Sequence, residues 1–285
     1  MEQAGLIAAR ALLYGTLLPA AGLPLYLLTA GKGPVAGRPV RLAAAGLALL
    51  AAAATLWWLF ASIAAMAGLP LGQLDRATVE AVSAATPLGA VVRLRLAALA
   101  ILAATVLPRL PLALPALAGL VALATAAFTG HAGASEGAIG LLHRTADILH
   151  LAAAGCWIAA LGVFVAGAFG SAPAQALEAR LARFATAGTA IVAILVPTGL
   201  VNTLLIAGWP VPLSTRWSTL LALKLALFAA MLCLAALNRW RLTPALERGE
   251  AGARGALRVS IGCEMACGLA VLALVAVLGS LDPAA

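Results

Sequence analysis

Eight apolar stretches, each about as long as a membrane-crossing helix, dominate this 285-residue sequence. A helix needs roughly 20 apolar residues to cross the hydrocarbon core of a bilayer. Only 10% of the residues are charged and 64% are hydrophobic, whereas soluble domains carry about 25% charged residues, so a soluble fold is excluded. We predict an all-α fold, a polytopic membrane helix bundle that forms a single integral membrane domain over residues 1–285. Its eight transmembrane helices are expected at residues 5–28, 42–67, 88–107, 112–130, 145–169, 184–207, 217–237 and 259–280.

The first stretch also has a second interpretation. Arg10 precedes an apolar run that ends in Thr29-Ala30-Gly31, which is a pattern found in signal peptides. Removal of such a peptide would leave seven spans instead of eight.

Basic residues lie mostly in alternate connections between the stretches. The chain has 18 Lys and Arg against 10 Asp and Glu. Eleven of the basic residues follow odd-numbered stretches, and only Arg76, Arg144 and Arg216 lie in the other connections. Basic residues are enriched in cytoplasmic loops, so we expect both termini to be periplasmic, and the net charge of +8 then needs no nucleic-acid partner. Arg93 and Arg95, inside the third stretch, are expected to extend toward the lipid headgroups.

The three histidines of the chain fall within 20 consecutive positions. His131 ends the fourth stretch and His143 and His150 begin the fifth, so all three are expected at the outer face. On a helix His143, Asp147 and His150 would share one side, within about a 60° arc. Imidazole and carboxylate bind transition metals, and such groups are costly in a membrane unless they function. We predict a metal site of His131, His150 and Asp147, with His143 as a further candidate; alternatively, His143 lies near water at the headgroups and Asp147 pairs with an arginine.

Other polar and sulfur-containing residues lie deeper in the predicted bundle. Intramembrane polar groups often mark ion pathways, and soft sulfur ligands suit reduced copper. The candidates for a pathway are Asn202, Lys224, Glu264, Cys263, Cys267 and Met265. In the alternative, Lys224 extends to the interface, Asn202 bonds a neighbouring helix, and the sulfur residues are ordinary apolar packing.

Pro197 and Gly199 interrupt the middle of the sixth stretch. Proline removes a helical hydrogen bond and kinks the helix, so the two residues are a candidate hinge. Proline kinks also serve packing in membrane helices, and the sequence does not decide between the two roles.

The chain has no phosphate-binding glycine loop, ATPase signature or Cys-x-x-Cys motif. We therefore expect neither an ATP-driven pump nor an enzyme, and we assign no catalytic residues.

Ordered motifs over residues 125–282 connect the chain to a known family. They are Gly130-His131-Ala132, Asp147-x-x-His150 with Trp157-Ile-Ala-Ala-Leu161, Arg183-Phe184, Gly199-x-x-Asn202, Leu221-x-x-Lys224, Asn238-Arg239 and Glu264. They resemble the copper resistance protein D (CopD/PcoD-like) family of bacterial inner-membrane proteins. The family usually has Trp-Val-Gly-Gly-Leu at the second motif, so helix packing there is expected to be looser in this chain.

The resemblance implies a multi-pass inner-membrane protein that imports copper from the periplasm for copper homeostasis and resistance. It implies His131 and His150 as copper ligands beside Asp147, and a separate periplasmic CopC-like protein as partner. The ion could be Cu(I) or Cu(II). Two alternatives remain: a b-type cytochrome whose haem is held by His131 and His150 from neighbouring helices, or a copper sensor or scaffold that does not transport.

Overall fold

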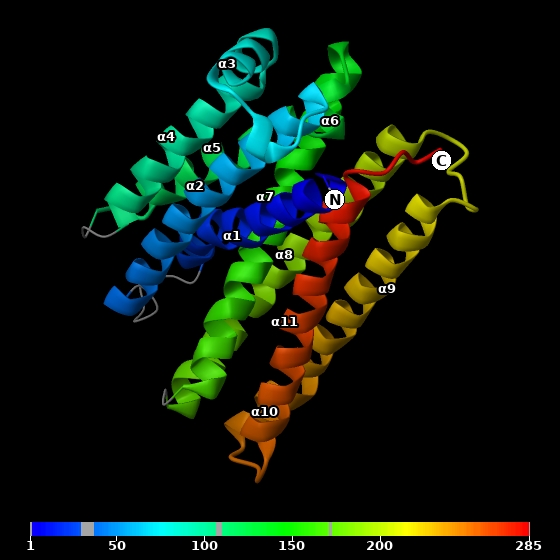
Figure 1. Cartoon of the computed structure of the whole chain (residues 1–285). Helices are drawn as coiled ribbons and strands as arrows, with labels where there is room; N and C mark the ends of the chain where they lie inside the picture. Colours follow the sequence, from blue (N-terminus) through cyan, green and yellow to red (C-terminus); the bar gives the residue numbers. More distant parts are fainter. Residues whose placement is uncertain (1, 30–36, 107–109, 171–172, 285) are drawn as a thin grey trace.

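The computed structural model describes residues 2–29, 37–106, 110–170 and 173–284, and within these ranges every regular element is helical (Figure 1). The predicted all-α fold is therefore confirmed. The elements are α1 (Glu2–Thr29), α2 (Arg38–Ala67), η2 (Leu71–Gln73), α3 (Arg76–Ala85), α4 (Leu88–Val106), α5 (Ala113–Ala124), η3 (Thr125–Phe128), α6 (His131–Ala134), α7 (Gly137–Phe169), α8 (Ala174–Ala207), α9 (Arg216–Leu237), η4 (Asn238–Leu242), α10 (Thr243–Glu247) and α11 (Ala253–Leu278).

Seven helices in the described part of the chain are long and apolar enough to cross a membrane: α1, α2, α4, α7, α8, α9 and α11. The stretch predicted at 112–130 forms a shorter apolar unit, α5 followed by the 3₁₀ turn η3. The 12 residues of α5 and the four of η3 together span about 26 Å, against the roughly 30 Å of a hydrocarbon core. Eight crossings are therefore not confirmed by helix length alone.

Helix α1 lies at the centre of the bundle and contacts α2, α5, α7 and α11 (Figure 1). It approaches α7 very closely at one point, because a Cβ placed on Gly22 would overlap the backbone carbonyl of Gly155. A Cβ on Gly155 would in turn lie 2.9 Å from the Leu18 carbonyl oxygen. Small residues let membrane helices approach this closely. Helix α7, which carries two of the histidines and Asp147, is thereby fixed against the central helix.

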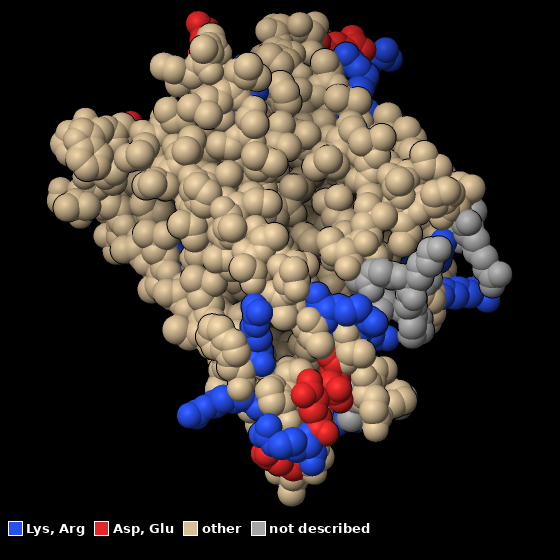
Figure 2. All heavy atoms as spheres, turned by 180° about the vertical axis from the view of Figure 1, so that it is seen from behind, with Lys and Arg blue, Asp and Glu red and all other residues tan. Residues whose placement is uncertain are grey.

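Basic side chains gather at one end of the molecule, the lower end in Figure 2, where α10 lies. We call this the basic end. There, Arg258 Nε donates a hydrogen bond to the Ala168 carbonyl over 2.6 Å, and Arg254 Nη2 donates to the Gly170 carbonyl over 3.0 Å. Both bonds satisfy carbonyls at the carboxyl end of α7, where helix carbonyls have no partner within the helix. Helix α11 thus holds the end of α7.

Candidate functional site

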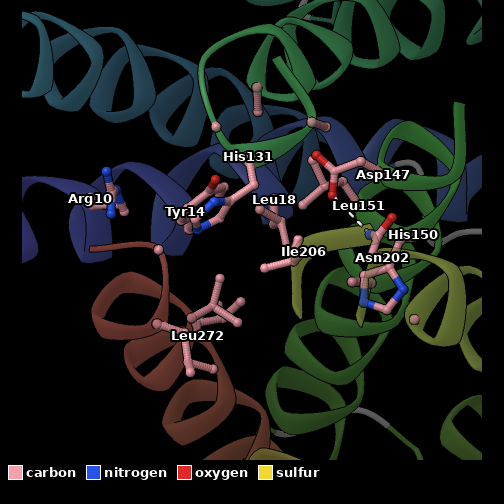
Figure 3. Close-up of a pocket in the computed structure, with 18 of the residues that line it drawn as sticks. Arg10, Tyr14, Leu18, His131, Asp147, His150, Leu151, Asn202, Ile206 and Leu272 are labelled. Atoms are coloured by element: carbon pink, nitrogen blue, oxygen red, sulfur yellow. Dashed lines mark hydrogen bonds between the residues drawn. The ribbon is translucent and has the colours of Figure 1, made fainter. Parts of the chain in front are cut away.

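A cavity of about 200 Å³ lies toward the end of the bundle opposite the basic end. It brings together residues from eight helices, α1, α2, α4, α6, α7, α8, α9 and α11, and we call it the His/Asp cavity (Figure 3). The residues predicted from sequence that line it are His131, His143, Asp147, His150, Gly199, Asn202 and Lys224. All four candidate metal ligands predicted from the sequence therefore line the same cavity.

His150 is held by the Pro197-Thr198-Gly199 segment of α8, through which the helix continues without a break. Its Nδ1 lies 3.0 Å from Thr198 Oγ1, and that hydroxyl donates to the Ile194 carbonyl over 2.6 Å. Because the hydroxyl proton is used in the second bond, Thr198 Oγ1 accepts a hydrogen bond from the Nδ1–H group of His150. This tautomer leaves Nε2 with a free lone pair, which is the arrangement that metal-binding histidines adopt.

The Pro197-Thr198-Gly199 segment therefore has a defined structural role beside His150. Thr198 supplies the hydrogen bond, and a Cβ on Gly199 would lie 3.3 Å from Cε1 of His150. Glycine leaves room for the imidazole at this point. Pro197 lies within α8. The role of Pro197 and Gly199 as a hinge stays a prediction.

Asp147 is half-buried and accepts a hydrogen bond from Asn202 Nδ2 at 3.1 Å. The prediction of a helix-to-helix bond for Asn202 is confirmed, since this bond joins α7 to α8. Asp147 forms no ion pair with an arginine within the described ranges. Its carboxylate retains acceptor capacity for a further ligand, since each oxygen can accept two bonds.

His143 is only 1% exposed, so the interpretation that it lies near water is wrong. Its Nδ1 lies 2.9 Å from Ser135 Oγ, and Arg144 Nη1 donates to the Ser135 carbonyl at 2.9 Å. These bonds fold the α6–α7 connection over the first turns of α7 and bury the imidazole. Helix α7 begins at Gly137, ahead of the predicted start at residue 145, which places His143 within the helix.

His131 approaches the cavity from the opposite side. It is the first residue of the four-residue helix α6, and its ring lies beside Tyr14 in Figure 3, apart from Asp147 and His150. Partial desolvation, followed by the nearby Arg10 guanidinium, lowers the pKa of His131 below its usual 6.5, while Asp282 opposes the shift. The imidazole is therefore neutral at pH 7, as a metal ligand must be.

The candidate ligands share a cavity but are not assembled into a coordination shell. No three His, Cys, Asp or Glu side chains in residues 2–29, 37–106, 110–170 and 173–284 are grouped so that they could hold a metal ion. The predicted metal site of His131, Asp147, His150 and His143 stays a prediction. Its four residues line one cavity, and further approach is needed for them to bind one ion.

A second cavity, of about 620 Å³, lies nearer the basic end and is lined by Glu264, so we call it the Glu264 cavity. Glu264 is 3% exposed and accepts hydrogen bonds from Trp157 Nε1 at 2.8 Å and Asn238 Nδ2 at 3.0 Å. Asn238 begins η4, a π-helical turn, and such turns are frequent at functional sites. Arg239, next in sequence, bonds the Ala185 carbonyl and the Thr189 hydroxyl on α8.

The predicted sulfur residues lie elsewhere. Cys263 is exposed, while Met265 and Cys267 are half-buried. None of the three lines the His/Asp cavity or the Glu264 cavity. Their role in a copper pathway stays a prediction.

Sequence reasoning missed the charged residues that α1 and α4 contribute to the His/Asp cavity. Arg95 is fully buried and lines the cavity, so the expectation that it extends to the headgroups is wrong. Arg10 and Tyr14, from α1, also line the cavity. The sequence did contain a signal for these residues. Arginines inside an apolar stretch usually face the interior of a helix bundle, and Arg10 and Arg95 both lie in such stretches.

In a comparison with known proteins, the chain matches two protein-family models and is similar to two relatives. Residues 178–278 match "Copper resistance protein D", and residues 1–141 match "Copper resistance protein D-like, N-terminal domain". Copper resistance protein D of Pseudomonas syringae pv. tomato is 40% identical over 218 residues, which cover 70% of this chain and 69% of the relative. Inner membrane protein YebZ of Escherichia coli (strain K12) is 32% identical over 160 residues, 54% of each chain. No solved structure matches the chain.

Proposed function

Because the chain belongs to the copper resistance protein D family and is a multi-pass inner-membrane protein, we propose that its His/Asp cavity receives copper from the periplasm. The observation that supports this most directly is the state of His150. Its Nδ1 is engaged by Thr198, which leaves Nε2 available to a ligand, and His150 and Asp147 line the same cavity.

In this proposal copper bridges two sides of the cavity. His150 and Asp147 bind from α7 and His131 from α6, with His143 as a further candidate ligand. Because no three of these groups are assembled in the described ranges, binding draws His131 toward Asp147. Imidazole and carboxylate suit Cu(II), whereas sulfur ligands at Cys263, Met265 and Cys267 would suit Cu(I) after entry.

The proposed orientation places both termini and the His/Asp cavity in the periplasm. The end of α11 lies beside the start of α1, because a Cβ on Gly279 would lie 2.9 Å from Arg10 Nη1. Termini on the same side require an even number of crossings, so the α5–η3 unit makes the eighth, within a single domain over residues 1–285. The basic end then faces the cytoplasm, as the distribution of basic residues favours.

Under this proposal copper moves toward the Glu264 cavity and the cytoplasm for copper homeostasis. Asn202 and Lys224 lie at the start of that pathway and Glu264 near its end. A separate periplasmic CopC-like protein would deliver the ion, and the chain itself performs transport without catalysis. The haem alternative is disfavoured, because a cavity of about 200 Å³ is smaller than the roughly 300–1,000 Å³ of most cofactor sites.

Copper titration of the purified protein tests the proposed site. We expect His150→Ala to weaken copper binding at least tenfold, because the variant removes a ligand. Cys233→Ala, which changes an exposed residue outside both cavities, should bind like the unaltered protein. Unchanged affinity in His150→Ala would overturn the proposed site. Copper accumulation in sealed proteoliposomes then separates a transporter from a sensor or scaffold.

Thr198→Val should weaken copper binding about tenfold while keeping every ligand. The valine has nearly the shape of threonine but cannot accept the hydrogen bond from His150 Nδ1, and loss of such an orienting partner costs about 10–100-fold in metal affinity. Thr203→Val is the matched control, because Thr203 lies on the same helix and lines the same cavity, while its hydroxyl donates to the Gly199 carbonyl and, among the described residues, to no candidate ligand. Equal losses in the two variants would contradict a specific role for Thr198.

A further inference from the structure

Arg95 is a buried cation with most of its donors unused. The residue is 0% exposed and lies on α4, where its Nε donates to Thr125 Oγ1 at 2.7 Å. Its guanidinium carbon lies 5.3 Å from the centre of the Trp58 ring, a cation–π contact. Neither Nη1 nor Nη2 has a hydrogen-bond partner in the described part of the chain. A buried charge without a counter-ion is strongly destabilising, so these two groups point to a missing acceptor.

The His/Asp cavity around Arg95 has an excess of positive charge. Arg10, Arg95 and Lys224 line it, and Asp147 is the carboxylate among its described lining residues. Arg10 Nη1 is also buried without a hydrogen-bond partner among the described residues. Tyr14, which also lines the cavity, lies within electrostatic range of both arginines. A cavity of this composition repels a bare cation and attracts an anion.

We propose that the His/Asp cavity contains a binding site for a small monovalent anion, of halide or carboxylate chemistry, at the unused donors of Arg95. Guanidinium donors bind carboxylates in pairs and also donate to a halide. The volume of about 200 Å³ accommodates an ion of this size together with a few waters, each of which occupies about 30 Å³. The position of Thr125 and Trp58 fixes the guanidinium plane in advance, which reduces the entropy lost on binding.

The anion site exists independently of copper, but it has a consequence that rests on the proposed function. Copper that enters the cavity meets three cations and one carboxylate. A resident anion offsets that repulsion, so copper and the anion should bind with positive coupling. By linkage, each must then raise the affinity of the protein for the other by the same factor.

Binding of radiolabelled chloride to the copper-free protein in detergent tests the site. We expect saturable binding of about one chloride per chain, displaced by acetate if the site favours carboxylates and retained in acetate if it favours halides. Arg95→Gln should weaken binding at least tenfold. Arg93→Gln, an exposed arginine two positions away on the same helix, should bind like the unaltered protein.

Absence of saturable binding, or equal binding in Arg95→Gln, would overturn the anion site. If Arg95→Gln does not fold, Arg95→Lys gives a second test: it keeps the charge but loses the paired donors, so acetate binding should fall more than chloride binding. If acetate and chloride binding both stay unchanged in Arg95→Lys, the assignment to the Arg95 donors is wrong.

A copper titration with and without the anion that binds, chloride or acetate, then tests the coupling, with weakly coordinating perchlorate as the balancing anion. Copper affinity should rise severalfold with the bound anion in the unaltered protein and in Arg93→Gln, but not in Arg95→Gln. Anion binding without any copper binding would overturn only the proposed function. Copper binding with no anion binding would overturn only the anion site.

Discussion

Gly22→Ala should lower the free energy of unfolding by roughly 3 kcal/mol or more, at or above the upper end of the usual cost of overpacking. The added methyl group would overlap the Gly155 carbonyl across the α1–α7 contact. The overlapping atom belongs to the backbone, so no side-chain rotation can relieve the clash, and the two helices must move apart. Denaturant unfolding in detergent micelles, followed by circular dichroism, measures the change.

Gly15→Ala provides the matched control on the same helix. A Cβ at Gly15 meets no heavy atom within 4 Å, so alanine should leave stability unchanged or raise it by up to about 1 kcal/mol through helix propensity. Similar stabilities for the two variants would contradict the close α1–α7 contact. Because α7 carries His150 and Asp147, Gly22→Ala should also weaken copper binding.

Asn238→Leu should lower the free energy of unfolding by about 2 kcal/mol, since it leaves Glu264 Oε2 buried without a donor. The measurement is the same denaturant titration. Trp157 would continue to donate to Oε1, so the loss is confined to one oxygen. Leucine keeps the number and branching of the side-chain heavy atoms of asparagine, but its methyl groups are larger, so a packing contribution must be measured separately.

A double-mutant cycle separates this hydrogen bond from the packing of η4. In a Glu264→Leu background the carboxyl group is absent, and Asn238→Leu should then cost less than about 0.5 kcal/mol. Replacing both polar partners by apolar residues is often nearly neutral, whereas removing one is not. An equal cost in both backgrounds would show that Asn238 acts through packing instead of through Glu264.

The long helices and the family could be predicted from sequence because both depend on local patterns. The length of the apolar stretches predicted eight membrane-crossing helices, and seven of these stretches form helices long enough to cross a membrane in the described part of the chain. The resemblance to the copper resistance protein D family is confirmed, and the match to residues 1–141 extends it into a region where no motif was recognised. The spacing of His143, Asp147 and His150 placed them on one helix, and the structure adds that they line one cavity.

The remaining features depend on contacts between distant segments. Arg95 is buried because Thr125 and Trp58, about 30 and 37 positions away, receive its guanidinium group, and no local pattern encodes that pairing. His143 is buried by Ser135 from the preceding connection. The ten-residue helix α3 was not expected, although Asp75 caps it by accepting a bond from the Thr78 backbone amide.

The bonds at the two ends of α7 divide the candidate copper ligands into a fixed group and an adjustable one. Ser135 and Arg144 hold the beginning of this helix, and Arg254 and Arg258 hold its end. His131 stands instead on a helix of only four residues. Under the proposed function, capture of copper requires the displacement of one short helix at the mouth of the cavity. The membrane-embedded bundle can therefore keep its packing, and its permeability barrier, while the ion is bound.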